Sequence, residues 1–252
     1  MTIFLDFPGG EFDAGVAFWR EITGSRLSAF RGAGKEFATL LPPDGDAFLR
    51  VQRIAEGPGG CHLDLHLDLS AGSLEEAAAE AMVLGGHVRD RDGDEVIIVD
   101  SPGGFTFCFV PWDGEAVIPA PLSTDGAGLS QAAQLCLDIP AAEFKRECSF
   151  WSALTGWGPK PSPASEYVFL QRPRGMPVSL IFQRRASAAP GDRVSGHIDI
   201  GCSDQPRMVE RHVAAGARAG AQLPWWTVMA DPVSRPYCLT KRHPVTGDLS
   251  DA

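Results

Sequence analysis

Polar and apolar side chains alternate over residues 62–68, and a shorter version of the same pattern recurs at residues 197–200. Strict alternation predicts a β-strand that buries its leucines and places His62, Asp64 and His66 on the opposite face. An imidazole beside a carboxylate can orient a ligand or exchange a proton with it. The candidate catalytic residues are therefore His62, Asp64, His66, His197 and Asp199.

A purely structural explanation of these residues stays open. Asp64 and Asp199 could pair with nearby arginines such as Arg50 or Arg53, while the histidines make ordinary buried hydrogen bonds. Arg50 and Gln52 are alternate residues of one predicted strand, so they share a face. An arginine beside an amide suits recognition of an oxygen-rich ligand.

The bulk composition narrows the function classes. The chain has 252 residues and a formal net charge of −10, which argues against nucleic-acid binding because phosphate needs a positive surface. The six cysteines form no CxxC pair and no dense framework, so a reduced, cytoplasmic protein is expected. The first residues lack the features of a signal peptide, and no apolar run reaches the roughly 20 residues of a membrane span.

The chain contains an internal duplication. Phe-Trp-x-x-(Ile/Leu)-Thr-Gly occurs at residues 18–24 and 150–156, and Leu-Asp-x-Pro at 5–8 and 137–140. Gln-Arg occurs at 52–53 and 183–184, His-x-Asp at 62–64 and 197–199, and an aromatic residue before cysteine at 107–108 and 237–238. Because the motifs keep their order and nearly one spacing, two homologous domains are predicted, at 1–122 and 128–245. The Pro/Gly-rich stretch around residue 125 is the predicted connection.

Each copy predicts the same succession of elements. A strand ending at a proline precedes a helix, whose apolar stripe is Phe12, Val16, Trp19 and Ile22 in copy one and Phe144, Cys148, Trp151 and Leu154 in copy two. Gly24 and Gly156 are placed to end these helices in the left-handed conformation. A hairpin, the alternating strand, a second helix and final strands follow, and Ser73 with Glu76 predicts a capping box at the second helix of copy one. The fold class is α+β.

This ordered set of motifs resembles the glyoxalase/bleomycin-resistance/dioxygenase (vicinal oxygen chelate) superfamily. The resemblance covers nearly the whole chain, twice. It implies two tandem glyoxalase-like domains, each a pair of βαβββ modules that form a cupped mixed sheet. It also implies that a metal or an organic ligand is held on the concave face of the sheet.

The resemblance implies which strand positions would carry metal ligands, so the residues at those positions can be compared with the ligands expected. In copy one, His62 matches and Gln52 could contribute, and His197 and Gln183 correspond to them in copy two. Neither copy has a histidine in its first strand, and the closing strand has Thr106 or Pro236 where a glutamate is expected. Because a divalent ion needs three or four good ligands, no resident metal or other cofactor is expected. A divalent metal at His62, His197, Gln52 and Gln183 is the alternative.

The predicted function is binding of a small organic ligand, contacted by Arg50, Gln52, His62, Gln183 and His197. An enzyme of the superfamily, a metal-dependent or acid–base lyase, isomerase or dioxygenase, is the alternative. A third possibility is a partner-binding role with both cups closed by side chains. The duplication fits a monomer whose two domains mimic a dimer, or a homodimer.

Overall fold

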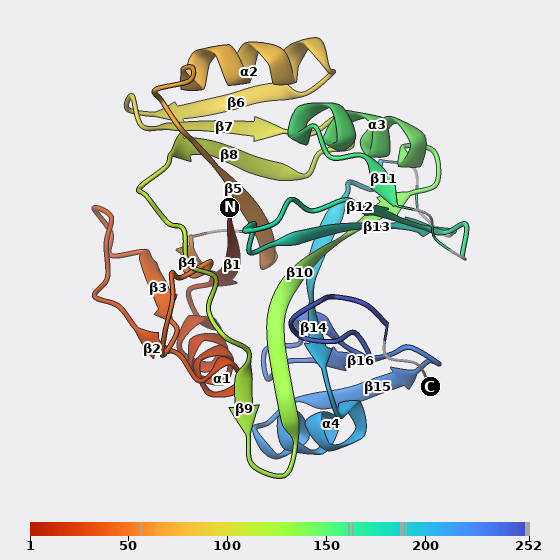
Figure 1. The fold of residues 1–252 in the computed structure, drawn as a ribbon. Coiled ribbons are helices and arrows are strands. Elements are labelled where there is room, and N and C mark those ends of the chain that lie inside the picture. The colour runs from red at the N-terminus through yellow and green to blue at the C-terminus, as the bar shows by residue number, and fades with distance from the viewer. Residues whose placement is uncertain (56, 161, 163, 187–188, 190, 250–252) are drawn as a thin grey trace. The chain divides into compact units, whose positions relative to one another are not determined.

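The structure is a computed structural model that describes residues 1–55, 57–160, 162, 164–186, 189 and 191–249. Its helices within these ranges are α1 (Phe12–Thr23), α2 (Leu74–Val83), α3 (Phe144–Thr155) and α4 (Gln205–Ala214) (Figure 1). The strands up to the second helix are β1 (Thr2–Pro8), β2 (Arg26–Leu27), β3 (Phe37–Leu41), β4 (Leu49–Ile54) and β5 (Gly60–Leu67). Those that follow are β6 (His87–Asp92), β7 (Val96–Asp100), β8 (Thr106–Pro111) and β9 (Leu122–Thr124).

The second copy repeats this succession. Its strands are β10 (Gly128–Pro140), β11 (Pro159–Lys160), β12 (Tyr167–Leu170), β13 (Ser179–Arg185), β14 (Ser195–Cys202), β15 (Arg218–Gln222), β16 (Trp226–Ala230) and β17 (Pro236–Thr240). One sheet has the order β2-β3-β4-β1-β5-β8-β7-β6 and the other β11-β12-β13-β10-β14-β17-β16-β15, with β9 paired to β10. The two orders are equivalent strand by strand, which confirms the predicted duplication and the α+β fold class.

The chain forms two compact units, and each combines parts of both copies. Unit 1 consists of Met1–Phe4, Cys61–Ala116 and Leu135–Gly196, and unit 2 of Leu5–Gly60, Val117–Gln134 and His197–Ala252. Unit 1 thus joins the second half of copy one to the first half of copy two. Unit 2 joins the first half of copy one to the second half of copy two.

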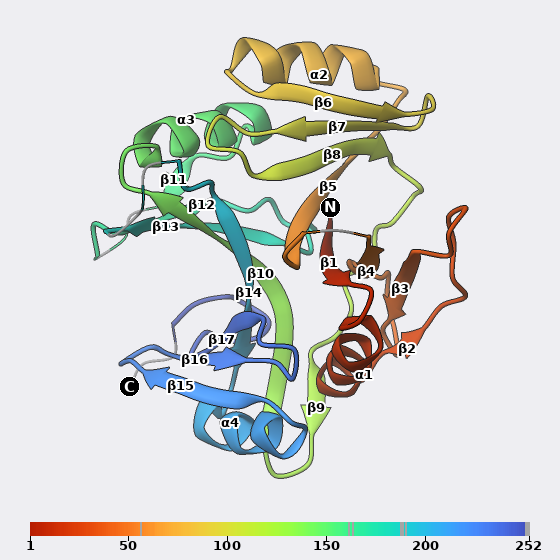
Figure 2. The same cartoon turned by 180° about the vertical axis from the view of Figure 1, so that it is seen from behind.

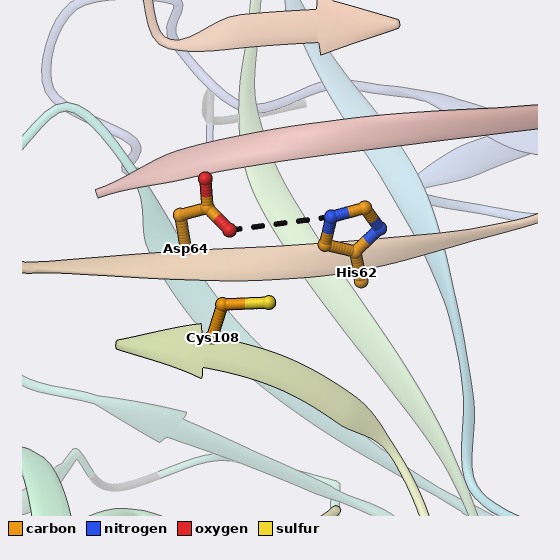
Figure 3. Close-up of side chains that lie close together, drawn as sticks. All are labelled: His62, Asp64 and Cys108. Atoms are coloured by element: carbon orange, nitrogen blue, oxygen red, sulfur yellow. Dashed lines mark ion pairs between the residues drawn. The ribbon is translucent and has the colours of Figure 1, made fainter. Parts of the chain in front are cut away.

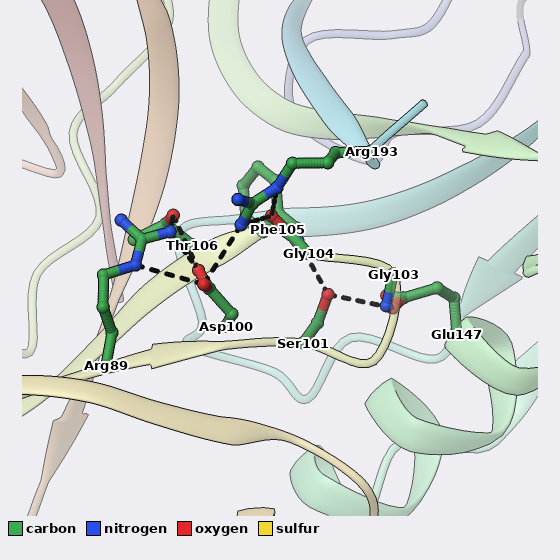
Figure 4. A network of polar contacts seen from close by, with 9 residues as sticks. All are labelled: Arg89, Asp100, Ser101, Gly103, Gly104, Phe105, Thr106, Glu147 and Arg193. Atoms are coloured by element: carbon green, nitrogen blue, oxygen red, sulfur yellow. Dashed lines mark hydrogen bonds and ion pairs between the residues drawn. The ribbon is translucent and has the colours of Figure 1, made fainter. Parts of the chain in front are cut away.

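In unit 1, helix α3 of copy two packs on strand β8 of copy one. The ring centroids of Phe107 and Trp151 are 5.0 Å apart, and those of Phe150 and Trp151 are 5.4 Å apart. The Trp151 indole N–H donates to the Glu147 carboxylate. The same carboxylate accepts from the Ser101 hydroxyl and the Gly103 backbone N–H (Figure 4). The buried carboxylate therefore joins the helix to the loop before β8.

Asp100, in the same network, is held by two arginines. Arg89 donates to the Asp100 carboxylate and to the Thr106 hydroxyl, and Arg193 forms an ion pair with Asp100 at 3.0 Å (Figure 4). Arg193 also donates to the Gly104 carbonyl. Helix α2 lies over β6 and β7 of the same unit, as both views of the ribbon show (Figures 1 and 2).

In unit 2, helix α1 of copy one packs in the corresponding way on β17 of copy two. The centroids of Trp19 and Tyr237 are 5.4 Å apart, and the Trp19 indole N–H donates to Asp231 at 3.0 Å. Asp231 is fully buried and accepts from the backbone N–H groups of Val233 and Arg235. A single aspartate here does what Glu147 and Ser101 do together in unit 1.

Several local predictions are confirmed, and one is wrong. Gly24 and Gly156 end their helices at φ 63° and 69°, and Ser73 and Glu76 form the capping box. The predicted apolar stripe of α1 is buried. In α3 Trp151 is buried as predicted, but the other buried residues are Glu147 and Phe150, whereas Phe144, Cys148 and Leu154 are half-buried. The buried face includes Glu147 because its carboxyl group meets three hydrogen-bond donors inside the core.

The connection between the copies is more regular than predicted. It contains β9, whose residues pair antiparallel with the start of β10. The polar segment after β17 also includes a β-bridge between Arg242 and Leu249. None of the described helices is long and apolar enough to cross a membrane.

Candidate functional site

The candidate site is built by two parallel strands, β5 and β8. In their register Leu63 lies opposite Phe107, and Asp64 lies opposite Cys108. Leu63 and Phe107 are fully buried. Because side chains alternate along a strand, His62, Asp64 and His66 lie on the other face together with Cys108.

His62, Asp64 and Cys108 form one group on this face (Figure 3). His62 Nε2 lies 4.0 Å from Asp64 Oδ1, and the His62 ring stacks on Phe4 with centroids 4.4 Å apart and an interplanar angle of 10°. Asp64 is 5% exposed and Cys108 7% exposed. The stacked ring holds the imidazole in one orientation beside a carboxylate that is largely removed from water.

His66 occupies the next position of the same face and belongs to a second polar group. Its Nε2 lies 2.8 Å from the Thr2 hydroxyl, and its Nδ1 lies 3.1 Å from Glu115 Oε1. Burial raises the pKa of Glu115, but backbone hydrogen bonds and the neighbouring His66 outweigh it, and the pKa lies below its ordinary value. Glu115 is therefore ionised at neutral pH and places a negative charge beside the His66 ring.

Unit 2 repeats the first group on β14 and β17. His197 Nε2 lies 3.2 Å from Asp199 Oδ1 and 3.6 Å from Cys238 Sγ, and Asp199 is the register partner of Cys238. Burial, and then the charge of Asp199, raises the pKa of Cys238 to about 11. The thiol is therefore protonated at neutral pH.

The remaining predicted site residues lie elsewhere in the two units. Arg50 and Gln52 are alternate, half-buried residues of β4 in unit 2. Gln183 lies on β13 in unit 1, where its Oε1 is 3.9 Å from Cys136 Sγ. Arg53, considered as a partner for Asp64, forms its ion pair with Asp13 at 3.4 Å.

The residues of the first group fit a divalent metal ion. One donor atom each from His62, Asp64 and Cys108 lie within 4.8 Å of one another. Nitrogen, oxygen and sulfur donors together suit zinc, whose bonds of about 2.0–2.3 Å require donors slightly closer than this. The expectation of no metal considered Thr106 at the closing strand, and Thr106 is engaged by Arg89 and Asp100. Asp64 and Cys108 were not considered as metal ligands, although each lies two residues further along its strand, after His62 and Thr106 respectively.

Sequence reasoning missed five residues that border the site. These are Thr2, Phe4, Cys108, Glu115 and Cys238. Alternation with Phe107 and Phe109 was a usable signal for the facing of Cys108. The parallel register that sets Cys108 opposite Asp64 has no signature in the sequence.

Comparison with solved structures gives the same fold. The 2,2',3-trihydroxybiphenyl 1,2-dioxygenase of Sphingomonas wittichii strain RW1 is 16% identical with a TM-score of 0.65, over 98% of this chain and 91% of that one. The Mn(II)-bound glyoxalase of Novosphingobium aromaticivorans is 14% identical with a TM-score of 0.64, over 94% and 80%. A mutant of 4-hydroxymandelate synthase from Streptomyces coelicolor is 13% identical with a TM-score of 0.62, over 99% and 94%.

No curated protein sequence matches the chain significantly. The family model described as "Glyoxalase-like domain" matches twice, at residues 2–110 and 134–240. The two matches correspond to the two predicted copies and together cover most of the chain. The protein therefore belongs to the glyoxalase-like domain family, with two tandem domains in one chain.

Proposed function

We propose that this protein binds a small organic molecule carrying neighbouring oxygen atoms, and that protein side chains on the polar sheet face hold it directly. The observation that carries the proposal is an imidazole beside a buried carboxylate, present as His62 with Asp64 and again as His197 with Asp199. Buried charged side chains are costly to a fold, so their repetition in both copies favours a role in binding.

The chemistry of the pair suits a hydroxyl-bearing ligand. A buried carboxylate accepts a strong hydrogen bond from a ligand hydroxyl, and the adjacent imidazole donates to or accepts from a second oxygen. Phe4 fixes the plane of His62 before the ligand arrives, which lowers the entropy lost on binding. In this proposal Gln183 provides a further polar contact in unit 1, and Arg50 and Gln52 do so in unit 2.

Isothermal titration with catechol, whose hydroxyls are adjacent, tests this proposal against resorcinol, whose hydroxyls are not. We expect saturable binding of catechol and much weaker binding of resorcinol. His62→Gln and His197→Gln together should weaken catechol binding by roughly tenfold or more, about 1.4 kcal/mol. The exposed His87 gives the matched control, and His87→Gln should bind normally. Equal affinity for the two isomers would refute the requirement for neighbouring oxygens.

A second candidate function is a metal-dependent lyase or dioxygenase, favoured by the donor atoms of His62, Asp64 and Cys108. A divalent ion held there would act as a Lewis acid toward a bound oxygen. Two structurally similar proteins are described as an Mn(II)-bound glyoxalase and as a dioxygenase, which makes metal chemistry a reasonable test. Elemental mass spectrometry of protein purified without chelator distinguishes the candidates, because this function requires about one ion per site that is lost in Asp64→Asn.

A further inference from the structure

The structure contains a pocket that lies apart from the polar sheet face. It has a volume of about 250 Å³ and belongs entirely to unit 2. Its walls come from the end of α1, the β3–β4 hairpin, residues 119–123 of the connection and the start of β10. We propose that this pocket is a second binding site, for a compact, uncharged, mostly hydrocarbon molecule of one or two rings.

The pocket opens on the helix side of the sheet. Leu40 and Leu49, which line it, are register partners on β3 and β4. They alternate with Thr39 and Arg50, which are partners on the opposite face. Ile22, at the end of α1, completes this wall. A molecule in the pocket would therefore lie across the sheet from Arg50, and the proposal does not depend on the function proposed above.

One wall of the pocket, which we call the roof, is formed by residues 119–123 of the connection between the copies, and hydrogen bonds hold this segment to the β3–β4 hairpin. The Asp46 carboxylate accepts from the Val117 N–H at 2.8 Å, and the Asp46 N–H donates to the Val117 carbonyl at 2.7 Å. The Asp44 carboxylate accepts from the Ala120 N–H at 3.0 Å. These three hydrogen bonds join the hairpin to the connection on both sides of Gly45 and leave the connection little freedom, so the cavity is formed before a ligand arrives.

The hairpin and the connection approach each other closely at Gly45. It adopts φ +64°, and a Cβ atom at this position would lie 2.7 Å from the Pro119 backbone nitrogen. On the opposite side of the pocket, the Gln131 amide donates to the Pro119 carbonyl at 2.8 Å. The roof is therefore held from both the hairpin and β10.

The lining determines the chemistry of the occupant. None of the described residues that line the pocket carries a positive charge, so an anion is disfavoured. Three polar side chains of the lining already have partners: Thr23 donates to the Trp19 carbonyl, Gln131 to Pro119, and Asp44 accepts from Ala120. The other contacts are mainly with leucine, isoleucine, proline and phenylalanine side chains. Such a surface retains water poorly and favours an uncharged apolar molecule.

The volume sets the size of that molecule. An apolar cavity of about 150 Å³ binds benzene, whereas sites for drug-sized ligands start at about 300 Å³. The pocket lies between these limits, which corresponds to one ring or two fused rings. Indole is a suitable probe because it is uncharged, bicyclic and soluble enough for titration.

The test is titration of the full chain with indole, followed by methyl NMR. We expect saturable binding, with shifts of the methyl signals of Ile22, Leu40 and Ile200, and no shift of Ile97 in unit 1. Ala132 lines the pocket, and Ala132→Leu should fill part of it and weaken binding by roughly tenfold. Ala219→Leu, at an exposed position of β15, is the control. Because the wild-type methyl map needs no variant, a folding defect in Ala132→Leu leaves the test intact.

Two outcomes would overturn the proposal: no saturable binding at millimolar indole, or binding that shifts methyl signals outside the pocket. Addition of catechol separates this site from the one proposed above. If both sites exist, catechol should leave the indole affinity unchanged. Failure of catechol to bind would affect only the function proposed for the polar sheet face.

Discussion

Asp64 and Cys108 lie opposite each other on adjacent parallel strands, and Asp199 and Cys238 repeat this relationship in the second copy. All four side chains are buried, and each aspartate lies two residues after a histidine on the same strand face. Duplication has therefore preserved a three-residue group rather than a single ligand position. Both proposed functions, ligand binding and metal chemistry, depend on this group.

The Cys238 thiol should respond to the loss of its neighbouring charge. Burial and the Asp199 carboxylate raise its pKa to about 11, so alkylation by iodoacetamide should be slow at pH 8. Asp199→Asn removes the charge that opposes the thiolate and should lower this pKa. The pH dependence of alkylation, followed by peptide mass spectrometry, measures the shift. Asp125→Asn, at an exposed position, should leave the rate unchanged; an unaltered profile in Asp199→Asn would mean that burial alone sets the pKa.

Glu147 should make the stability of the protein depend on pH. Burial raises its pKa above the ordinary 4.5, although hydrogen bonds from Gly103, Ser101 and Trp151 oppose the shift. The folded state therefore retains a proton on this carboxyl group to a higher pH than the unfolded state does. The stability due to this proton is present below about pH 4.5 and is lost as the pH rises through the raised pKa.

Glu147→Gln provides the comparison for this effect. The amide cannot accept all three hydrogen bonds, so the variant should be less stable by about 1–3 kcal/mol. This difference from wild type should decrease as the pH rises from 4.5 to 7, as measured by urea unfolding. Glu210→Gln, on the exposed face of α4, should show no such trend. A difference that grows with pH would show that Glu147 is more easily ionised in the folded state.

His212 should also make the stability of the protein depend on pH, but in the opposite direction to Glu147. Burial, and then the charge of Arg211, lowers its pKa to about 3 from the ordinary 6.5. Between pH 6.5 and 3 the unfolded state therefore binds a proton at His212 that the folded state does not bind. The free energy of unfolding should fall by up to about 1.4 kcal/mol for each unit by which the pH decreases through this range. His212→Gln should remove this contribution, whereas His87→Gln should retain it. Parallel acid-unfolding curves for wild type and His212→Gln would contradict the assignment.

Substitution of Asp231 should destabilise the folded protein strongly. It is fully buried and accepts hydrogen bonds from the Trp19 indole and from two backbone N–H groups. Asp231→Ala leaves these donors without an acceptor and should destabilise the protein by about 3–5 kcal/mol. Thermal unfolding of this variant should be compared with Asp125→Ala, which should unfold close to the wild-type temperature. A loss below about 1 kcal/mol would show that the helix α1 contact does not depend on this carboxylate.

The sequence was sufficient for the elements that local patterns specify. The alternation over residues 62–68 predicted β5 and its polar face, and Ser73 with Glu76 predicted the start of α2. The duplicated motifs predicted two homologous domains and their family. These features follow from residue periodicity and from hydrogen bonds between near neighbours, so they can be recognised without tertiary contacts.

Features that depend on long-range contacts could not be predicted. The burial of Glu147 depends on Ser101 and Gly103, more than 40 residues away, so the amphipathic pattern of α3 gave a rotated face. The proximity of Cys108 to Asp64 depends on the register of two parallel strands. The division into units that mix the two copies likewise arises from packing of helices α1 and α3 on a strand of the other copy.

Titration of catechol into chelator-treated protein tests the claim that protein side chains alone hold a ligand with neighbouring oxygens. We expect saturable binding to the wild type and at least roughly tenfold weaker binding to the Asp64→Asn, Asp199→Asn double variant. Unchanged affinity in the double variant would contradict the claim. Binding that disappears with chelator and returns with a divalent ion would contradict direct binding by side chains and establish the metal-dependent function instead.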